Sequence, residues 1–138
     1  MLFRSLIEAL LAAGDVRGAE AALQEADQFV ELSGEHFLLS DLRRLEGQIA
    51  LKQPEPDPGR AEICFLKSID IAHRQGSRLL ELRAVTDLAR LRRDTGSPTD
   101  LRPLLESILA TVEGGKATRD IPMARALLAE IGSSSSVV

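Results

Sequence analysis

The sequence predicts an all-α protein built from repeated pairs of helices, and three observations lead to this fold class. Apolar residues recur at helical spacing along most of the chain. Gly and Pro residues separate these segments, as expected at the ends of helices. Small residues recur at one interval, because Ala61 follows Ala19 by 42 positions and Ala89 follows Gly47 by the same distance. A constant interval of about 20 to 50 residues is typical of helical repeat arrays.

The composition is that of one soluble globular domain. The chain has 138 residues, of which 44% are hydrophobic and 28% are charged. It contains four Phe residues but no Trp or Tyr, and its formal net charge is −4. Stacking on bases needs aromatic rings, and binding to nucleic acids or anionic membranes needs a basic surface. We therefore expect neither nucleic acid nor a membrane as a partner.

The first helix pair is expected within residues 1–34. The apolar stripe of its first helix consists of Phe3, Leu6, Ile7 and Leu10. Gly14 separates this helix from the next. The stripe of the second helix consists of Ala19, Ala22, Leu23, Ala26 and Val30. The step from Ser33 to Gly34 is expected to end the pair, because Gly is a preferred C-terminal cap.

The second helix pair is expected within residues 35–76. The apolar stripe of the third helix consists of Leu38, Leu42, Leu45 and Ile49. The proline-rich segment 54–58 must end this helix, because proline lacks the amide donor. The stripe of the fourth helix consists of Ala61, Phe65, Ser68, Ile69 and Ala72. Gly76 is expected to close the pair.

The third helix pair is expected within residues 77–114. The fifth helix, with the stripe Leu82, Val85, Leu88 and Ala89, ends at Gly96. The sixth helix, with the stripe Leu101, Leu104, Leu105 and Ile108, ends at Gly114 and Gly115. A terminal helix over 120–131 completes a single domain that spans residues 1–131. The Ser-rich segment 132–138 is expected to be a disordered tail.

The small residues of these pairs resemble the pattern of the tetratricopeptide repeat family. Gly47 and Ala89 match the small residue of the family's first helix. The pattern of its second helix is matched by Ala19, Leu23 and Ala26, and again by Ala61, Phe65 and Ser68. The first copy departs at Ile7, the third copy departs at Leu101, Leu105 and Ile108, and the family's signature Trp and Tyr are missing. The resemblance implies a right-handed superhelix of about three helix pairs with a C-terminal capping helix. It also implies a concave groove that binds a protein or peptide.

A second resemblance concerns the length of the repeat, which exceeds the ~34 residues of the standard form. Segments 79–84 and 124–130 look like parts of the C-terminal repeats of large bacterial signalling ATPases. This resemblance implies a role in bacterial signalling. It also leaves an alternative, in which the chain is a regulatory or self-association segment derived from such an ATPase.

Residues with catalytic, cofactor-binding or metal-binding spacing are sparse. The Gly115-Lys116 step lacks the Ser or Thr of a phosphate loop. His36 and His73 have no second ligand at metal-binding spacing, and His73 suits the last turn of a helix. We therefore expect no enzyme, no cofactor and no metal site. The remaining enzymatic alternative is a small enzyme that uses Asp or Glu with Arg, and it requires a deep pocket.

The lone cysteine and the N-terminal residues indicate the compartment. Cys64 lies in an apolar segment and is expected in the core, and a chain with one cysteine forms no internal disulfide. Arg4 and Glu8 place charge too early for a signal peptide, and no apolar run approaches the ~18 residues that span a bilayer. These features predict a cytoplasmic protein.

The candidate binding residues lie opposite the apolar stripes of the third and fifth helices. They are Arg44, Gln48, Lys52, Arg83, Thr86, Arg90 and Arg93. Asp41 lies on the same face, as do Arg4 and Glu8 of the first helix. Cations outnumber acids along this line, and guanidinium groups form paired hydrogen bonds with carboxylates, so we expect a groove for an acidic peptide or protein. In the alternative, Asp87 pairs with Arg83 and Arg90, and Asp94 pairs with Arg90, as ordinary surface contacts.

Two further expectations concern packing. Gly47 and Ala61 are expected to permit close approach of the two helices in the middle pair. The chain also begins with the apolar residues Met1, Leu2, Phe3, Leu6 and Ile7. These residues suggest a homodimer that forms through the first helix. The alternative is that Leu2 and Phe3 pack inward.

Overall fold

The computed structural model describes residues 2–96, 101–112 and 120–135, and within them the chain forms seven α-helices and no strand. The helices are α1 (Leu2–Ala12), α2 (Val16–Ser33), α3 (Leu39–Lys52), α4 (Pro58–Arg74), α5 (Arg78–Thr95), α6 (Arg102–Val112) and α7 (Asp120–Ser135). A short 3₁₀ helix, η1 (His36–Leu38), precedes α3. The predicted all-α class is confirmed.

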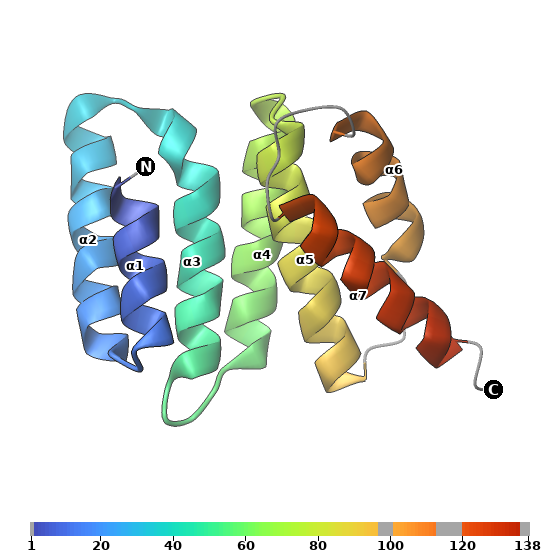
Figure 1. Ribbon diagram of the computed structural model, residues 1–138. Coiled ribbons are helices and arrows are strands. Elements are labelled where there is room, and N and C mark those ends of the chain that lie inside the picture. The colour runs from blue at the N-terminus through green and yellow to red at the C-terminus, as the bar shows by residue number, and fades with distance from the viewer. Residues whose placement is uncertain (1, 97–100, 113–119, 136–138) are drawn as a thin grey trace.

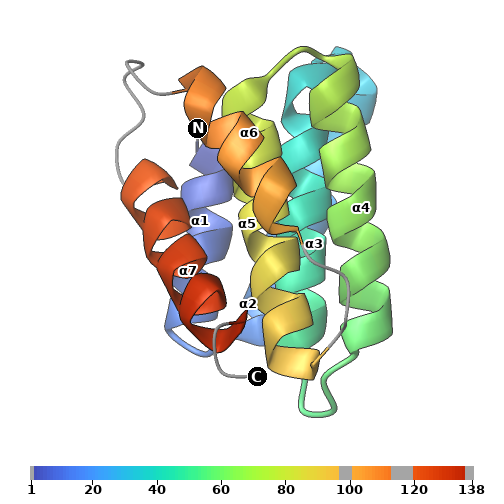
Figure 2. The ribbon, with the colours of Figure 1, turned by 90° about the vertical axis from the view of Figure 1, so that its right-hand side faces the viewer.

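Consecutive helices pack against each other in antiparallel order (Figure 1). Contacts also join α1 to α3, α3 to α5 and α5 to α7, so the odd-numbered helices share one layer. Figure 2 shows α1 and α7 on one side of the array and α4 on the other. Among the described residues no direct backbone contact joins α2 to α4 or α4 to α6. Helix α3 therefore separates α2 from α4, and α5 separates α4 from α6.

The helix ends follow local chemistry that is visible in the sequence. The side chains of Asp15, Asp57 and Ser77 accept hydrogen bonds from backbone amides in the first turns of α2, α4 and α5. Gly34 and Gly96 end α2 and α5 with φ of 74° and 73°, a left-handed conformation that glycine adopts without steric cost. The caps predicted at these two glycines are confirmed.

The C-terminal boundary differs from the prediction. Helix α7 continues to Ser135, so residues 132–135 of the expected tail are helical. Gly and Ser are weak helix formers, but they retain the backbone amide donor that proline lacks, so a helix can continue through them. The stop expected at Gly114 and Gly115 lies outside the described residues, as do residues 136–138.

The core follows the apolar stripes that the sequence predicts. Ile7, Leu42, Leu45 and Phe65 are among its largest fully buried side chains. The two helices of the middle pair approach each other closely at Gly47, where an added Cβ would lie 2.6 Å from the Cε1 atom of the Phe65 ring. A hydrogen atom alone fits there, which confirms the close approach predicted at this glycine.

The middle pair also contains a buried polar link that the apolar pattern did not indicate. Ser40 of α3 and Ser68 of α4 are both fully buried. The Ser40 hydroxyl donates a hydrogen bond to the Ser68 carbonyl oxygen at 3.0 Å, and the Ser68 hydroxyl donates to the Ser40 carbonyl oxygen at 2.7 Å. Each buried hydroxyl therefore has a partner, and the pair joins α3 to α4.

Candidate interaction surface

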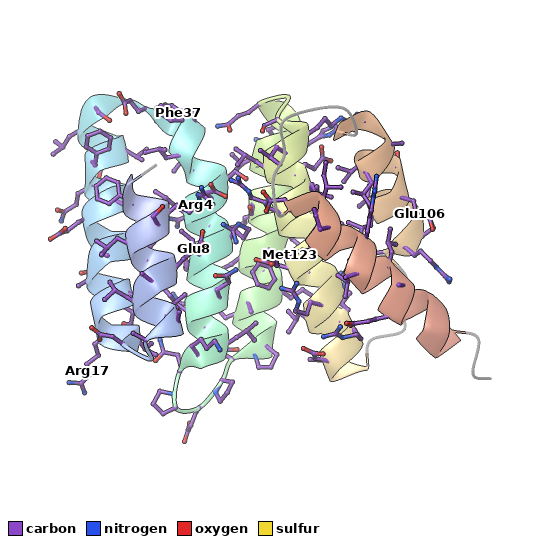
Figure 3. The ribbon with its side chains drawn as sticks, viewed as in Figure 1. Arg4, Glu8, Arg17, Phe37, Glu106 and Met123 are labelled. Carbon is purple, nitrogen blue, oxygen red and sulfur yellow. The ribbon has the colours of Figure 1, made fainter. Side chains whose placement is uncertain are left out.

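Helices α1, α3, α5 and α7 together present a surface rich in charge, which we call the charged face. A hollow of about 100 Å³ on this face is lined by Arg4, Glu8, Arg44, Gln48, Arg83, Thr86, Asp87, Arg90, Asp120 and Met123. Figure 3 shows Arg4 and Glu8 near the boundary of α1 and α3, and Met123 on α7. The four helices supply these side chains because contacts between odd-numbered helices bring them into one layer.

Arg44 lies at the centre of the charged face and is buried, with 6% of its surface exposed. Its guanidinium pairs with Asp41 at 3.3 Å, with Asp87 at 3.2 Å and with Glu8 at 3.7 Å. Burial by itself lowers the pKa of Arg44, but attraction to Asp87, Asp41 and Glu8 outweighs burial and raises the pKa above its ordinary value. Arg44 is therefore a compensated buried charge.

The acidic partners of Arg44 extend the network to other helices. Asp41 is also buried and pairs with Arg83 of α5 at 3.2 Å. Arg83 in turn pairs with Asp120 of α7 at 3.2 Å. Asp87 accepts a hydrogen bond from the Gln48 amide at 2.8 Å. This chain of contacts ties α3, α5 and α7 together.

The charge balance of this face differs from the predicted line of cations. Arg4, Arg44, Arg83 and Arg90 share the face with Glu8, Asp41, Asp87 and Asp120. Each of these arginines has an acidic partner, so the described side chains form a balanced network. The sequence did not reveal this balance of charge, because the carboxylates come from four helices. Asp120 in particular begins α7, and the predicted binding face was drawn only from the first, third and fifth helices.

The individual pairs also differ from the predicted ones. Asp87 does pair with Arg90, at 3.5 Å, as predicted. Arg83 instead pairs with Asp41 and Asp120, and Asp94 pairs with Arg93 at 3.0 Å rather than with Arg90. The pairings of Asp87 with Arg83 and of Asp94 with Arg90 were therefore wrong. Arg83 reaches across to carboxylates of the neighbouring helices, and Asp94 pairs with the adjacent Arg93 of its own helix.

Two of the candidate binding residues are turned to internal contacts. Thr86 is buried, and its hydroxyl donates to the Leu82 carbonyl oxygen at 2.7 Å. Arg44 is buried in the network described above. Both side chains lie below the surface of the charged face. A ligand on this face would therefore contact the more exposed side chains around them.

Two more hollows adjoin the first and contain the remaining candidates. The larger has a volume of about 520 Å³, and Leu11, Leu51, Phe65 and Leu91 contribute its apolar lining. Gln48, Lys52 and Arg90 line it as well. A smaller hollow of about 150 Å³ is lined by Arg90, Arg93, Met123 and Glu130, and Arg93 pairs there with Glu130.

The seven predicted residues therefore line adjoining hollows on one side of the molecule, and Arg90 lines all three. Lys52 differs from the arginines in its environment. Its side chain is exposed, and it forms no ion pair within residues 2–96, 101–112 and 120–135. Of the two cations that line the largest of these three hollows, Lys52 is therefore the one without an ion pair in the described structure, whereas Arg90 pairs with Asp87.

Within the described part of the chain, no group of three or more His, Cys, Asp or Glu side chains is arranged to hold a metal ion. Cys64 is buried as predicted, and burial together with the nearby Glu46 raises the pKa of its thiol. His73 lies in the last turn of α4, as expected, with its Nδ1 atom 3.5 Å from Glu81. None of the described helices combines the length and the apolar character needed to cross a bilayer.

Searches against protein-family models, curated proteins and solved structures found no match to this chain.

Proposed function

We propose that this protein is a non-enzymatic interaction module that binds a protein or peptide on its charged face. In this proposal the helix pairs form a right-handed superhelix of the tetratricopeptide type, and α7 caps its C-terminal end. Two features support the architecture: the odd-numbered helices contact one another in sequence, and Gly47 sits at a close helix contact. A surface spread over several repeats suits an extended ligand.

The main support for this proposal is the largest of the three hollows described above, which has a volume of about 520 Å³. Its apolar lining of Leu11, Leu51 and Leu91 can accept an apolar side chain, and Lys52 and Arg90 can contact a carboxylate beside it. We therefore propose a ligand with an apolar residue next to Asp, Glu or a C-terminal carboxylate. The balanced network around Arg44 holds this surface in place rather than attracting the ligand itself. Such a module would act in the cytoplasm, in keeping with the lone cysteine.

The test begins with selection of a displayed peptide library on the immobilised protein. A selected peptide is then titrated against the parent, Lys52→Glu and Lys67→Glu proteins. Lys67 is an exposed lysine of α4 outside the hollow, so its variant makes the same change of charge on another surface. We expect Lys52→Glu to weaken binding by about fivefold and Lys67→Glu to leave it unchanged. Equal affinities for all three proteins would refute the proposed site, as would a selection that enriches no peptide.

A second candidate function is self-association through the first helix, as in a regulatory segment of a signalling ATPase. One observation favours it: Leu6 of α1 and Phe29 of α2 are 45% and 40% exposed. Phe3, in contrast, is partly buried and packs against Phe29, with the ring centroids 5.7 Å apart. Sedimentation of the parent and of Leu6→Lys tests this candidate. A parent that sediments as a monomer at micromolar concentration would exclude it.

A further inference from the structure

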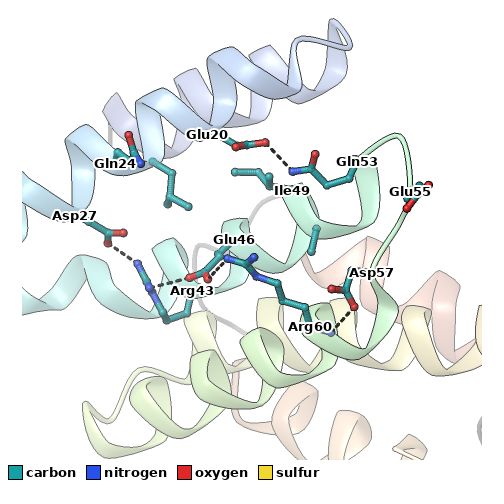
Figure 4. A pocket seen from close by; sticks show the side chains of 12 residues that line it. Glu20, Gln24, Asp27, Arg43, Glu46, Ile49, Gln53, Glu55, Asp57 and Arg60 are labelled. Atoms are coloured by element: carbon teal, nitrogen blue, oxygen red, sulfur yellow. Dashed lines mark hydrogen bonds and ion pairs between the residues drawn. The ribbon is translucent and has the colours of Figure 1, made fainter.

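A second groove lies on the opposite layer of the molecule, between α2 and α4. It has a volume of about 390 Å³, and residues of α2, α3, the segment 53–57 and the start of α4 line it. The groove exists because α2 and α4 have no direct backbone contact in the described structure, so α3 forms its floor. Figure 4 shows the side chains that surround it. The charged face uses none of these residues.

One end of this groove is balanced in charge. Arg43 of α3 donates hydrogen bonds to Asp27 of α2 and, at 2.7 Å, to Glu46 of α3. Arg60 of α4 donates to the other carboxylate oxygen of Glu46 at 3.2 Å. Two guanidinium groups therefore offset the two carboxylates of Asp27 and Glu46. A charged ligand gains little from this end.

The other end carries unbalanced negative charge. Glu20 accepts a hydrogen bond from the neutral amide of Gln53 at 2.7 Å. Asp57 caps α4 by accepting from the Arg60 backbone amide at 3.1 Å, and Glu55 is exposed without an ion pair in the described part of the chain. In Figure 4, Glu20, Gln53, Glu55 and Asp57 lie at one end of the pocket and Asp27 lies at the other.

We propose that this groove, which we call the acidic groove, binds a Lys- or Arg-bearing segment of a partner protein. The cationic head would lie among Glu20, Glu55 and Asp57, none of which forms an ion pair with another described residue. Leu23 and Ile49 also line the groove. They offer apolar contact for the methylene stem that precedes the charge in both Lys and Arg. The concave shape together with the charge selects a basic side chain rather than a diffuse cloud of counterions.

The first measurement is fluorescence anisotropy with a labelled short peptide of alternating Lys and Ala at low salt. It compares the parent with the double variant Glu20→Gln, Glu55→Gln. The Glu20→Gln change should leave the fold intact, because an amide oxygen at this position can still accept the hydrogen bond from Gln53. The matched control is the double variant Glu25→Gln, Glu31→Gln, which removes two exposed carboxylates of α2 outside the groove.

We expect the groove variant to bind the peptide about fivefold more weakly and the control variant to bind like the parent. Equal weakening by both double variants would overturn the proposal, because it would show attraction to overall negative charge. A parent that does not bind the peptide would overturn it too. Circular dichroism melts check that each variant is folded.

The second measurement locates the peptide by amide chemical shifts in the labelled parent protein. We expect the shift changes at Gln24 and Gln53, which line the acidic groove. Changes confined to Lys52 and Arg90 would assign the peptide to the charged face and overturn the proposal. Sedimentation of the free protein tests whether a second copy of the chain occupies the acidic groove instead. If the parent is a dimer and the groove variant is a monomer, the groove is a dimer interface and the proposal is overturned.

Discussion

Replacement of Gly47 by Ala tests the close contact between α3 and α4 most directly. The new Cβ would lie 2.6 Å from Cε1 and 2.8 Å from Cδ1 of Phe65, so the ring or the helix must move. Overpacking of a core costs about 1 to 3 kcal/mol. Ala also favours the helix over Gly by about 1 kcal/mol. We therefore expect Gly47→Ala to lower the free energy of unfolding by about 1 kcal/mol.

The sign of the effect should depend on the Phe65 ring. In a Phe65→Leu background the ring is absent, so Gly47→Ala should raise the free energy of unfolding by up to about 1 kcal/mol. The assay is urea denaturation of the parent, both single variants and the double variant. Gly59→Ala is a matched control, because its Cβ would come no closer than 3.7 Å to Asp57. If Gly47→Ala has the same effect with and without the Phe65 ring, the steric argument is refuted.

Two other predictions concern Arg44 and Cys64. Asp87→Ala leaves the buried Arg44 without one of its acidic partners. We expect it to lower the free energy of unfolding, measured by urea denaturation, by about 3 kcal/mol. A decrease as small as that caused by Glu31→Ala, a change at an exposed residue, would contradict this. Because the Cys64 thiol is buried and its pKa is raised, a thiol reagent should label it slowly in the native protein and rapidly in urea. The folded state holds the Cys64 thiol proton more tightly than the unfolded state does. The protonated thiol therefore contributes fully to folding stability at neutral pH, and this contribution is lost as the pH rises above about 8.5. The stability of the parent should therefore fall relative to Cys64→Ala in that range, and parallel pH profiles would contradict the assignment.

Much of the helical framework could be read from local sequence. The caps at Gly34 and Gly96 and the break in segment 54–58 depend on the conformational limits of Gly and Pro, which act within a few residues. The apolar stripes depend on the helical period, and they correctly placed Ile7 and Phe65 in the core. The end of α7 was missed because Gly and Ser do not exclude a helix.

The candidate site was predictable as a face but not as a set of interactions. The spacing of Arg83, Arg90 and Arg93 along α5 places them on one side of a helix, because that spacing is a property of the helix itself. Their partners come from other helices: Arg83 pairs with Asp41 and Asp120, at separations of 42 and 37 positions. No local pattern contains such pairings.

The sequence by itself thus determined where the helices lie and which of their faces are apolar, because periodicity and capping act over one or two turns. The tertiary structure alone decided that Arg44 is buried between Asp41 and Asp87 and that the charged face is balanced. It also decided that a groove opens between α2 and α4 with Glu20 and Asp57 at one end. Burial and charge balance depend on which helices meet, and those meetings join residues that are distant in the chain.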